Sequence, residues 1–134
     1  MSVLVTDAGF QNDDWQSGFS DAGTVANDTI SLDLTSDTDP DTVPLTPSLQ
    51  MIRVEFPSFA DGRGFTIARQ LRLRGYEGRL RAKGHVLSDQ YAMARRSGFD
   101  EVEISDDLAA RQPEAEWLAR ANWHRHHYQA RLRG

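Results

Sequence analysis

Four basic side chains in the middle of the chain have the chemistry to hold an anion: Arg63, Arg81, Lys83 and His85. Such a set suits a phosphate, sulfate, sulfite or carboxylate group, to which charged donors make strong hydrogen bonds. Glycines beside these side chains allow backbone amides to approach an oxyanion closely. We therefore predict an anion site in which Asp61 and Asp89 orient the basic side chains. Three glycines belong to the same site: Gly62, Gly64 and Gly84.

Other interpretations of these residues stay open at this point. Asp61 and Gly62 form a common turn pair, Asp89 can cap a helix, and Arg81 can pack its stem on a sheet. A third possibility is an enzyme in which Asp61 or Asp89 is a general acid or base with His85 as its partner. Sequence spacing alone does not show that these side chains converge.

Three further chemistries find little support. Residues 62–68 faintly resemble a dinucleotide-binding fingerprint, but the third glycine is missing at the required spacing. His124, His126 and His127 crowd the C-terminal segment without an HExxH pattern or a cysteine, so we predict no metal site. Residues 51–97 carry 10 bases against four acids, but their aromatic residues are explained as core and the acidic N-terminal part would oppose phosphate. We predict no nucleic-acid partner.

The elements that must position the anion site begin at Met51. Short β-like runs alternate with helical patterns, which is typical of βαβ units and a parallel sheet. The predicted strands are residues 51–56, 78–83 and 101–104, and the predicted helices are residues 66–74, a segment after Ser88 and a last helical region after Asp106. Ligands of such sheets bind beyond the carboxyl ends of the strands, where the loops with the candidate residues begin.

Charge divides the chain into two parts. Residues 1–50 hold nine Asp and no Lys or Arg, whereas residues 51–134 hold all 15 bases against 11 acids. The two parts carry −9 and +4, which gives the net charge of −5. We expect residues 1–50 to be an acidic, weakly structured arm and linker, with residues 8–50 loop rather than core, that can add one or two short strands near residues 3–5 and 29–34. Residues 51–134 are predicted to form a small α/β domain, a parallel βαβαβ core with a C-terminal helix.

Composition excludes several classes of site. The chain has no cysteine, which excludes a disulfide framework, a Cys-ligated metal and a thiol nucleophile. No apolar run approaches the roughly 18 residues of a membrane span. Residues 1–7 lack the basic region of a signal peptide. The sequence therefore predicts a cytoplasmic protein without a membrane partner.

Three motifs, in order along the chain, resemble a known bacterial family. They are FPSFADGRGFTIARQLR from Phe56, GRLRAKGHVLSDQ from Gly78 and RSGFD from Arg96. Over about residues 52–104 the sequence resembles domain-of-unknown-function family 934, whose members are described as oxidoreductases involved in sulfite reduction. The motifs and the candidate anion site coincide at Asp61, Gly62, Arg63, Arg81, Gly84, Asp89 and Gln90.

The resemblance implies an association with assimilatory sulfite reduction and brings no established catalytic residue. The family often has cysteine at the position of Ser97, and this chain shows no flavin, haem or iron–sulfur motif, so enzyme activity and cofactor stay open. The leading hypothesis is an accessory protein that holds a small oxyanion or docks on sulfite reductase or its electron donor. The alternative is a non-catalytic interaction module or oligomeric scaffold, in which the acidic arm of this or a neighbouring subunit lies on the basic surface.

Overall fold

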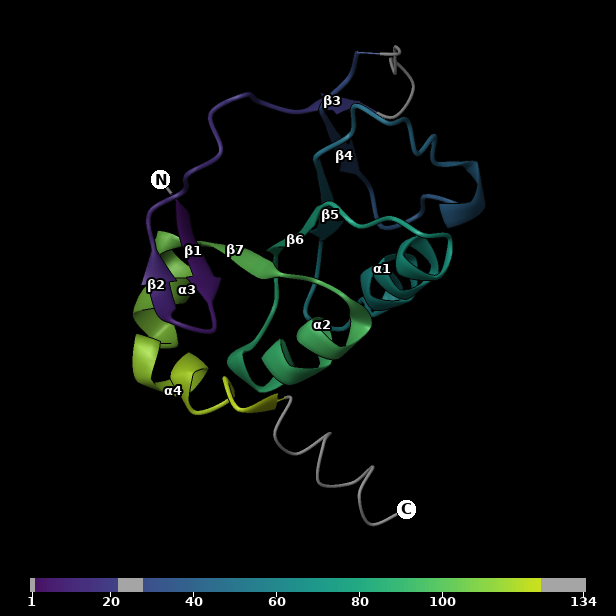
Figure 1. Ribbon diagram of the computed structural model, residues 1–134. Coiled ribbons are helices and arrows are strands. Elements are labelled where there is room, and N and C mark those ends of the chain that lie inside the picture. Colours follow the sequence, from purple (N-terminus) through teal and green to yellow (C-terminus); the bar gives the residue numbers. More distant parts are fainter. Residues whose placement is uncertain (1, 22–27, 124–134) are drawn as a thin grey trace.

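The computed structural model describes residues 2–21 and 28–123. A seven-stranded sheet forms its centre, with strand order β2-β1-β7-β6-β5-β4-β3 (Figure 1). The strands are β1 (Ser2–Thr6), β2 (Gly9–Gln11), β3 (Ser20–Asp21), β4 (Ser31–Leu34), β5 (Met51–Phe56), β6 (Arg79–Gly84) and β7 (Glu101–Ser105). Strands β3 to β7 are parallel, and β1 runs antiparallel to both β2 and β7.

The predicted α/β class is confirmed, because β5, α1, β6, α2 and β7 form the parallel core. The helices are α1 (Arg63–Leu73), α2 (Tyr91–Ser97), α3 (Asp106–Arg111) and α4 (Glu114–Leu118), with single 3-10 turns at η2 (Pro40–Thr42) and η3 (Ser88–Gln90). In the described part of the chain, no helix is long and apolar enough to cross a membrane.

Helix boundaries follow local chemistry. α1 begins three residues before the predicted Thr66, because the side chain of Asp61 already accepts a hydrogen bond from the backbone N of Arg63. Gly98 ends α2 with φ of +117°, a conformation that favours glycine. Pro113 separates α3 from α4, since proline disfavours helical conformation in the residue before it.

The apolar core lies on one face of the sheet. Alternation along the strands points Ile52, Val54 and Phe56 of β5 to this face, together with Leu80 and Ala82 of β6. All five side chains are buried, and α1 and α2 lie side by side over them (Figure 1). Burying each of the larger ones contributes about 1.5–3 kcal/mol.

The acidic arm enters the sheet more fully than the sequence predicts. Four short strands, β1 to β4, come from residues 2–34, where one or two are expected. β1 pairs with β7 and β4 pairs with β5, so the acidic part of the chain flanks the basic part on both sides. Leu32, Val43 and Leu49 are buried in the core, which corrects the expectation that residues 8–50 are loop rather than core. β1 and β4 correspond to the strands expected near residues 3–5 and 29–34. β2 and β3 are too short for a local pattern to indicate them, because pairing with β1 and β4 stabilises them.

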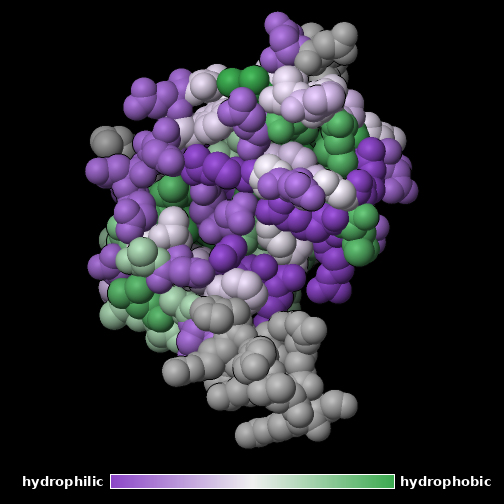
Figure 2. Space-filling model, viewed as in Figure 1, coloured by the Kyte–Doolittle hydropathy of each residue, from purple (hydrophilic) through white to green (hydrophobic). Residues whose placement is uncertain are grey.

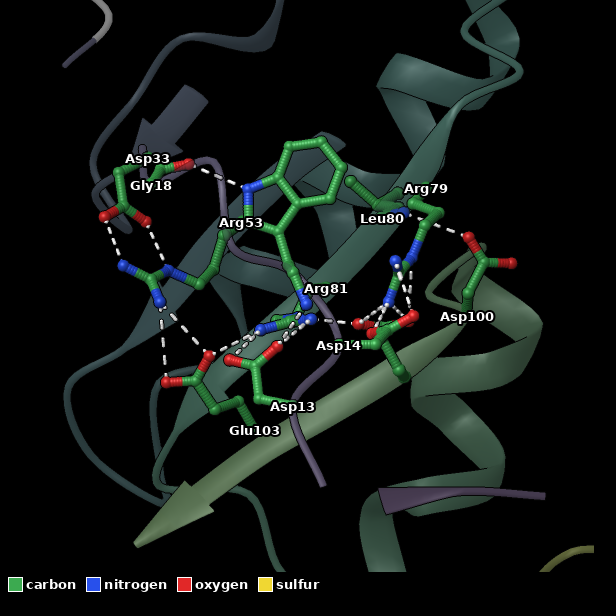
Figure 3. A network of polar contacts seen from close by, with 12 residues as sticks. Asp13, Asp14, Gly18, Asp33, Arg53, Arg79, Leu80, Arg81, Asp100 and Glu103 are labelled. Carbon is green, nitrogen blue, oxygen red and sulfur yellow. Dashed lines mark hydrogen bonds and ion pairs between the residues drawn. The ribbon is translucent and has the colours of Figure 1, made fainter. Parts of the chain in front are cut away.

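The opposite face of the sheet is polar. Arg53, Arg79, Arg81, Glu101 and Glu103 lie on this face, because each alternates with a core residue along its strand. Residues 12–19, which connect β2 to β3 without helix or strand, cross this face and are termed the strap (Figures 1 and 3). The helices cover one face of the sheet, and the strap crosses the other.

Candidate functional site

Arg81, one of the four predicted anion-binding residues, lies on the polar face with no exposed surface. Its Nε donates to Glu101 at 2.6 Å, and its Nη1 donates to Glu103 at 2.9 Å. Nη1 and Nη2 also donate to the two carboxylate oxygens of Asp13, both at 3.0 Å (Figure 3). Three carboxylates thus neutralise this guanidinium, which offsets the high cost of burying an unpaired charge.

Arginines on both sides of Arg81 repeat this arrangement. Arg79 donates to Glu101 at 2.7 Å and to Asp14 at 2.8 Å. Arg53 donates to Asp33 at 2.6 Å, and Figure 3 shows the same guanidinium reaching toward Glu103. These eight residues form the arginine lattice: Asp13, Asp14, Asp33, Arg53, Arg79, Arg81, Glu101 and Glu103.

The lattice also sets the charge of its members. Partial burial acts to raise the pKa of Asp13, but hydrogen bonds from Arg81 and from the backbone N of Trp15 outweigh it, and the pKa lies below its ordinary value. Hydrogen bonds from Arg79 lower the pKa of Asp14. Burial acts to lower the pKa of Arg81, while the surrounding carboxylates raise it above the ordinary value. These three groups are therefore charged at neutral pH.

Arg63 and Asp61 form a pair at the start of α1. The Arg63 guanidinium donates to both carboxylate oxygens of Asp61, at 3.0 and 2.8 Å. It also donates to the Ser36 hydroxyl at 2.9 Å. The Arg63 hydrogen bonds hold the pKa of Asp61 well below its usual range. Arg63 is thus already supplied with a counter-ion and a hydroxyl acceptor.

The loops that follow β5 and β6 meet at the edge of the sheet, as parallel strands require. The His85 ring packs edge-on against Phe59, with ring centres 5.0 Å apart. Gln90 links the same two loops, because its Nε2 donates to the carbonyl of Phe59 at 3.2 Å and its Oε1 accepts from the backbone N of Leu87 at 2.8 Å.

The remaining predicted residues lie in other surroundings. Lys83 is exposed on the polar face and lines a hollow with Asp21, Asp33 and Glu55. Asp89 pairs with Arg120 at 2.6 Å on the surface. The four predicted basic side chains therefore have four different environments: a buried lattice, a pair with Asp61, an acidic hollow and an aromatic loop contact.

Two of the three motif glycines are explained by packing around Phe56. A Cβ atom on Gly64 would lie 2.4 Å from Cζ of the Phe56 ring, and one on Gly84 would lie 2.6 Å from the Phe56 carbonyl oxygen. A Cβ atom on Gly62 would have room, with its nearest neighbour at 3.9 Å. Gly64 and Gly84 thus allow α1 and the β6 loop to approach the end of β5.

A pocket of about 230 Å³ opens beside His85, at the carboxyl ends of β6 and β7. Gly84, Ser105, Asp107, Leu108 and Arg111 complete its lining. The Ser105 hydroxyl accepts the backbone N–H of Leu108, which caps α3. Among residues 2–21 and 28–123, Arg111 has no ion-pair partner. The pocket therefore offers one unpaired guanidinium and one imidazole to a solute.

A groove of about 310 Å³ lies between α1 and α2, lined by Phe65, Thr66, Arg69, Gln70, Met93 and Ser97. Thr66, Arg69 and Leu73 follow helical spacing, so they share one side of α1, as Met93 and Arg96 share one side of α2. Met93 is 54% exposed and Leu73 is 73% exposed, so two large apolar side chains here are in contact with solvent. Figure 2 shows mostly hydrophilic side chains on this view of the molecule, with hydrophobic ones in small groups.

The charge around this groove is one-sided. α1, its C-cap residue Arg74 and α2 contain six arginines and no acidic residue. Three of the six have ion-pair partners, Arg63 with Asp61, Arg72 with Asp100 and Arg95 with Asp7. No described carboxylate pairs with the other three, and Arg74 and Arg96 donate only to backbone carbonyls. The lining residues of the groove, together with Leu73 and Arg96 on the same helix sides, are termed the arginine groove.

Sequence reasoning did not assign Arg69, Met93 or Arg111 to a site. The spacing of Thr66, Arg69 and Leu73 is a usable signal, because it places a polar, a cationic and an apolar side chain on one side of α1. No pattern around Arg111 indicates a pocket, since β6 and the loop after it complete the lining. Within the described residues, no group of three or more His, Asp or Glu side chains could hold a metal ion, and His124, His126 and His127 lie outside them.

Comparison with known proteins identifies a family. Searches of curated proteins and of solved structures find no match. A comparison with protein families matches residues 31–134 to "Bacterial protein of unknown function (DUF934)". The match runs from β4 onward and includes all three motifs around Phe56, Gly78 and Arg96. Because the match covers well over half of the sequence, the chain belongs to the DUF934 family of bacterial proteins.

Proposed function

We propose that this protein is a non-catalytic accessory protein of assimilatory sulfite reduction, which docks through the arginine groove on an acidic surface of sulfite reductase or of its electron donor. One observation carries the docking: exposed Met93 and Leu73 lie beside arginines that no described carboxylate neutralises. The link to sulfite reduction rests on the resemblance of the three motifs.

The mixture of side chains in the arginine groove suits a protein partner. Arginine and methionine are enriched in protein interfaces, whereas small molecules usually bind in enclosed pockets. Burial of Met93 and Leu73 would supply affinity. Arg69 and Arg96 would supply orientation and faster association with an acidic surface.

Unpaired arginines favour the groove over the arginine lattice as the docking surface. Arg81 already has three carboxylate partners, so an incoming anion would exchange one ion pair for another. Arg69 has no partner among the described residues, so a carboxylate from outside would add a charged hydrogen bond.

A binding measurement with purified components tests the docking. Sulfite reductase and its electron donor would be immobilised separately, and the Kd of the full chain measured at several salt concentrations. We expect Arg69→Glu to weaken binding at least tenfold, about 1.4 kcal/mol, and to reduce its salt dependence. Arg120→Glu makes the same charge change on another exposed arginine and is expected to alter the Kd less than twofold.

Two results would reject the docking. One is the absence of binding to either component at any salt concentration. The other is an equal loss of affinity for Arg69→Glu and Arg120→Glu, which would indicate an effect of net charge. Met93→Ala provides an uncharged check, because it removes only apolar contact.

A second candidate function is binding of a small oxyanion in the pocket beside His85. The specific observation is that Arg111 lines this pocket with no ion-pair partner among the described residues. Sulfite, sulfate and phosphate would each be tested for a shift in the melting temperature, since a ligand that binds only the folded state stabilises it. Stabilisation that disappears in Arg111→Ala and persists in Arg69→Ala would support this function. Identical melting curves with and without each ion would reject it.

A further inference from the structure

The strap contacts the polar face through two carboxylates and an aromatic ring. Asp13 and Asp14 contact it with paired carboxylate oxygens, on Arg81 and Arg79. Phe19 adds a ring contact, with the guanidinium carbon of Arg53 3.7 Å from the ring centre. The strap therefore presents two adjacent carboxylates and one aromatic ring to three arginines.

The lattice is balanced in charge without the strap. Its strand residues are three arginines and three carboxylates: Arg53, Arg79, Arg81, Asp33, Glu101 and Glu103. Asp13 and Asp14 are additional, so their departure leaves every arginine with at least one carboxylate. Departure of Glu101 would instead take a carboxylate from both Arg79 and Arg81, and Arg81 has no exposed surface. The strap carboxylates thus bind to the lattice as added ligands.

The strap covers the polar face with few buried contacts. Most of its residues are exposed, and it contains no helix or strand. Beyond its ionic and ring contacts, its carbonyl at Gly18 accepts a hydrogen bond from the Ser31 hydroxyl at 2.6 Å. Hollows of about 460 and 210 Å³ lie along the polar face, one beside Asn12 and Asp14 and one beside Asp33 and Lys83. Segments with few buried contacts open at low free-energy cost.

We infer that the polar face is a binding site for an extended acidic segment of a partner protein, with adjacent carboxylates for Arg79 and Arg81 and an aromatic ring for Arg53, and that the strap occupies this site until such a segment displaces it. Paired carboxylate–guanidinium contacts supply the recognition, because they are the strongest and most directional of the charged hydrogen bonds. This site is separate from the arginine groove and does not depend on it.

A peptide with the sequence of residues 11–20, carrying a fluorescent label, is the probe. It would be titrated with the full chain and with the double variant Asp13→Asn, Asp14→Asn, whose own strap is loosened. The matched control is Asp28→Asn, Asp41→Asn, which removes two exposed carboxylates of the same arm. We expect the strap variant to bind the peptide at least tenfold more tightly than the wild type and the control. A peptide with both Asp changed to Asn is expected not to bind.

Equal affinity of the peptide for the wild type and the strap variant would overturn the inference. So would binding that persists when the peptide lacks both carboxylates. A wild-type dimer that forms by exchange of straps, detected by concentration-dependent mass and abolished in the strap variant, would replace the partner segment by a second copy of the chain.

A second measurement covers the case in which the double variant does not fold. Hydrogen exchange of the wild type should show amides of residues 12–19 exchanging at least tenfold faster than those of β6. Equal protection of the two segments would mean that the strap does not open separately, and the inference would fail. The single variant Asp14→Asn, whose contact with Arg79 is the more exposed, then replaces the double variant in the titration.

Discussion

The arginine lattice and the arginine groove lie on opposite sides of one sheet. Both contain arginines, but those of the lattice are paired with carboxylates and those of the groove, within residues 2–21 and 28–123, are not. In the lattice, three arginines share five carboxylates. In the groove, Arg69 and Arg96 have no carboxylate partner among the described residues. The placement of carboxylates, and not the density of arginine, therefore separates arginines that are paired within the chain from those without a carboxylate partner in its described part.

The difference has a physical origin in solvation. A guanidinium without exposed surface, such as that of Arg81, loses its water and needs carboxylates to replace it. An exposed one, such as that of Arg69, keeps its water and needs no partner to remain charged. Replacing a residue should therefore cost stability in the lattice and binding in the groove.

Glu101→Gln is expected to have the largest effect. It removes a charged acceptor from both Arg79 and Arg81, and breaking a buried ion pair costs about 3 kcal/mol or more of the free energy of unfolding. Urea unfolding monitored by circular dichroism measures it. Glu55→Gln, an exposed residue on the same face, is the control and should change stability by at most about 0.5 kcal/mol. Equal losses would contradict a special role for the lattice.

Gly64→Ala tests the packing that positions the groove. Its Cβ would meet the Phe56 ring at 2.4 Å, and overpacking costs about 1–3 kcal/mol, against a gain of about 1 kcal/mol in helix propensity. Because this approach is very close, we expect a net loss of about 2 kcal/mol in urea unfolding. Gly62→Ala, where a Cβ has room, should cost less. If the two variants unfold alike, Phe56 does not limit the position of α1.

Acid should weaken the contacts of the strap. The pKa values of Asp13 and Asp14 are lowered in the folded protein, so their contribution to stability is complete above the unfolded value of about 3.9. It is lost as the pH falls through the lower folded values. We expect a smaller decrease in the free energy of unfolding below about pH 4 for the double variant Asp13→Asn, Asp14→Asn than for the wild type. Parallel curves for the two proteins would contradict this.

Arg69→Ala should have the smallest effect on stability. Its side chain is exposed and has no partner in the described structure, so the free energy of unfolding should change by no more than about 0.5 kcal/mol. The same unfolding measurement on Arg81→Ala should show a loss of several times that size, because Glu101 and Glu103 would lose a buried partner. A large loss for Arg69→Ala would remove the distinction between the two regions.

Much of the parallel core could be predicted from local pattern. The strand at Met51–Phe56 agrees in both limits with β5, and Gly75 and Gly98 mark the ends of α1 and α2. The alternation in β6 is also a local pattern, with Leu80 and Ala82 on the core face and Arg79 and Arg81 on the polar face. A pattern in the sequence also indicates the lattice. Basic residues occupy every second position of β6, and acidic residues occupy every second position at the start of β7.

The candidate site was less predictable, because it depends on pairing between distant residues. Arg81 follows a strand pattern that is equally compatible with a solvated side chain and a buried one. Its state depends on Asp13, which is 68 residues away in the chain. Similarly, Arg111 joins His85 in one pocket only because α3 follows β7 beside the end of β6.

Amino-acid order alone therefore specified the three strands of the parallel core, the glycines that end α1 and α2, the absence of thiol chemistry and the separation of acidic from basic charge. Each of these depends on side chains a few residues apart, where periodicity and turn chemistry act. The folded chain decided which of the described arginines are paired with carboxylates. Whether a guanidinium is neutralised depends on carboxylates brought to it from other strands and from the strap, and only the assembled sheet brings them there.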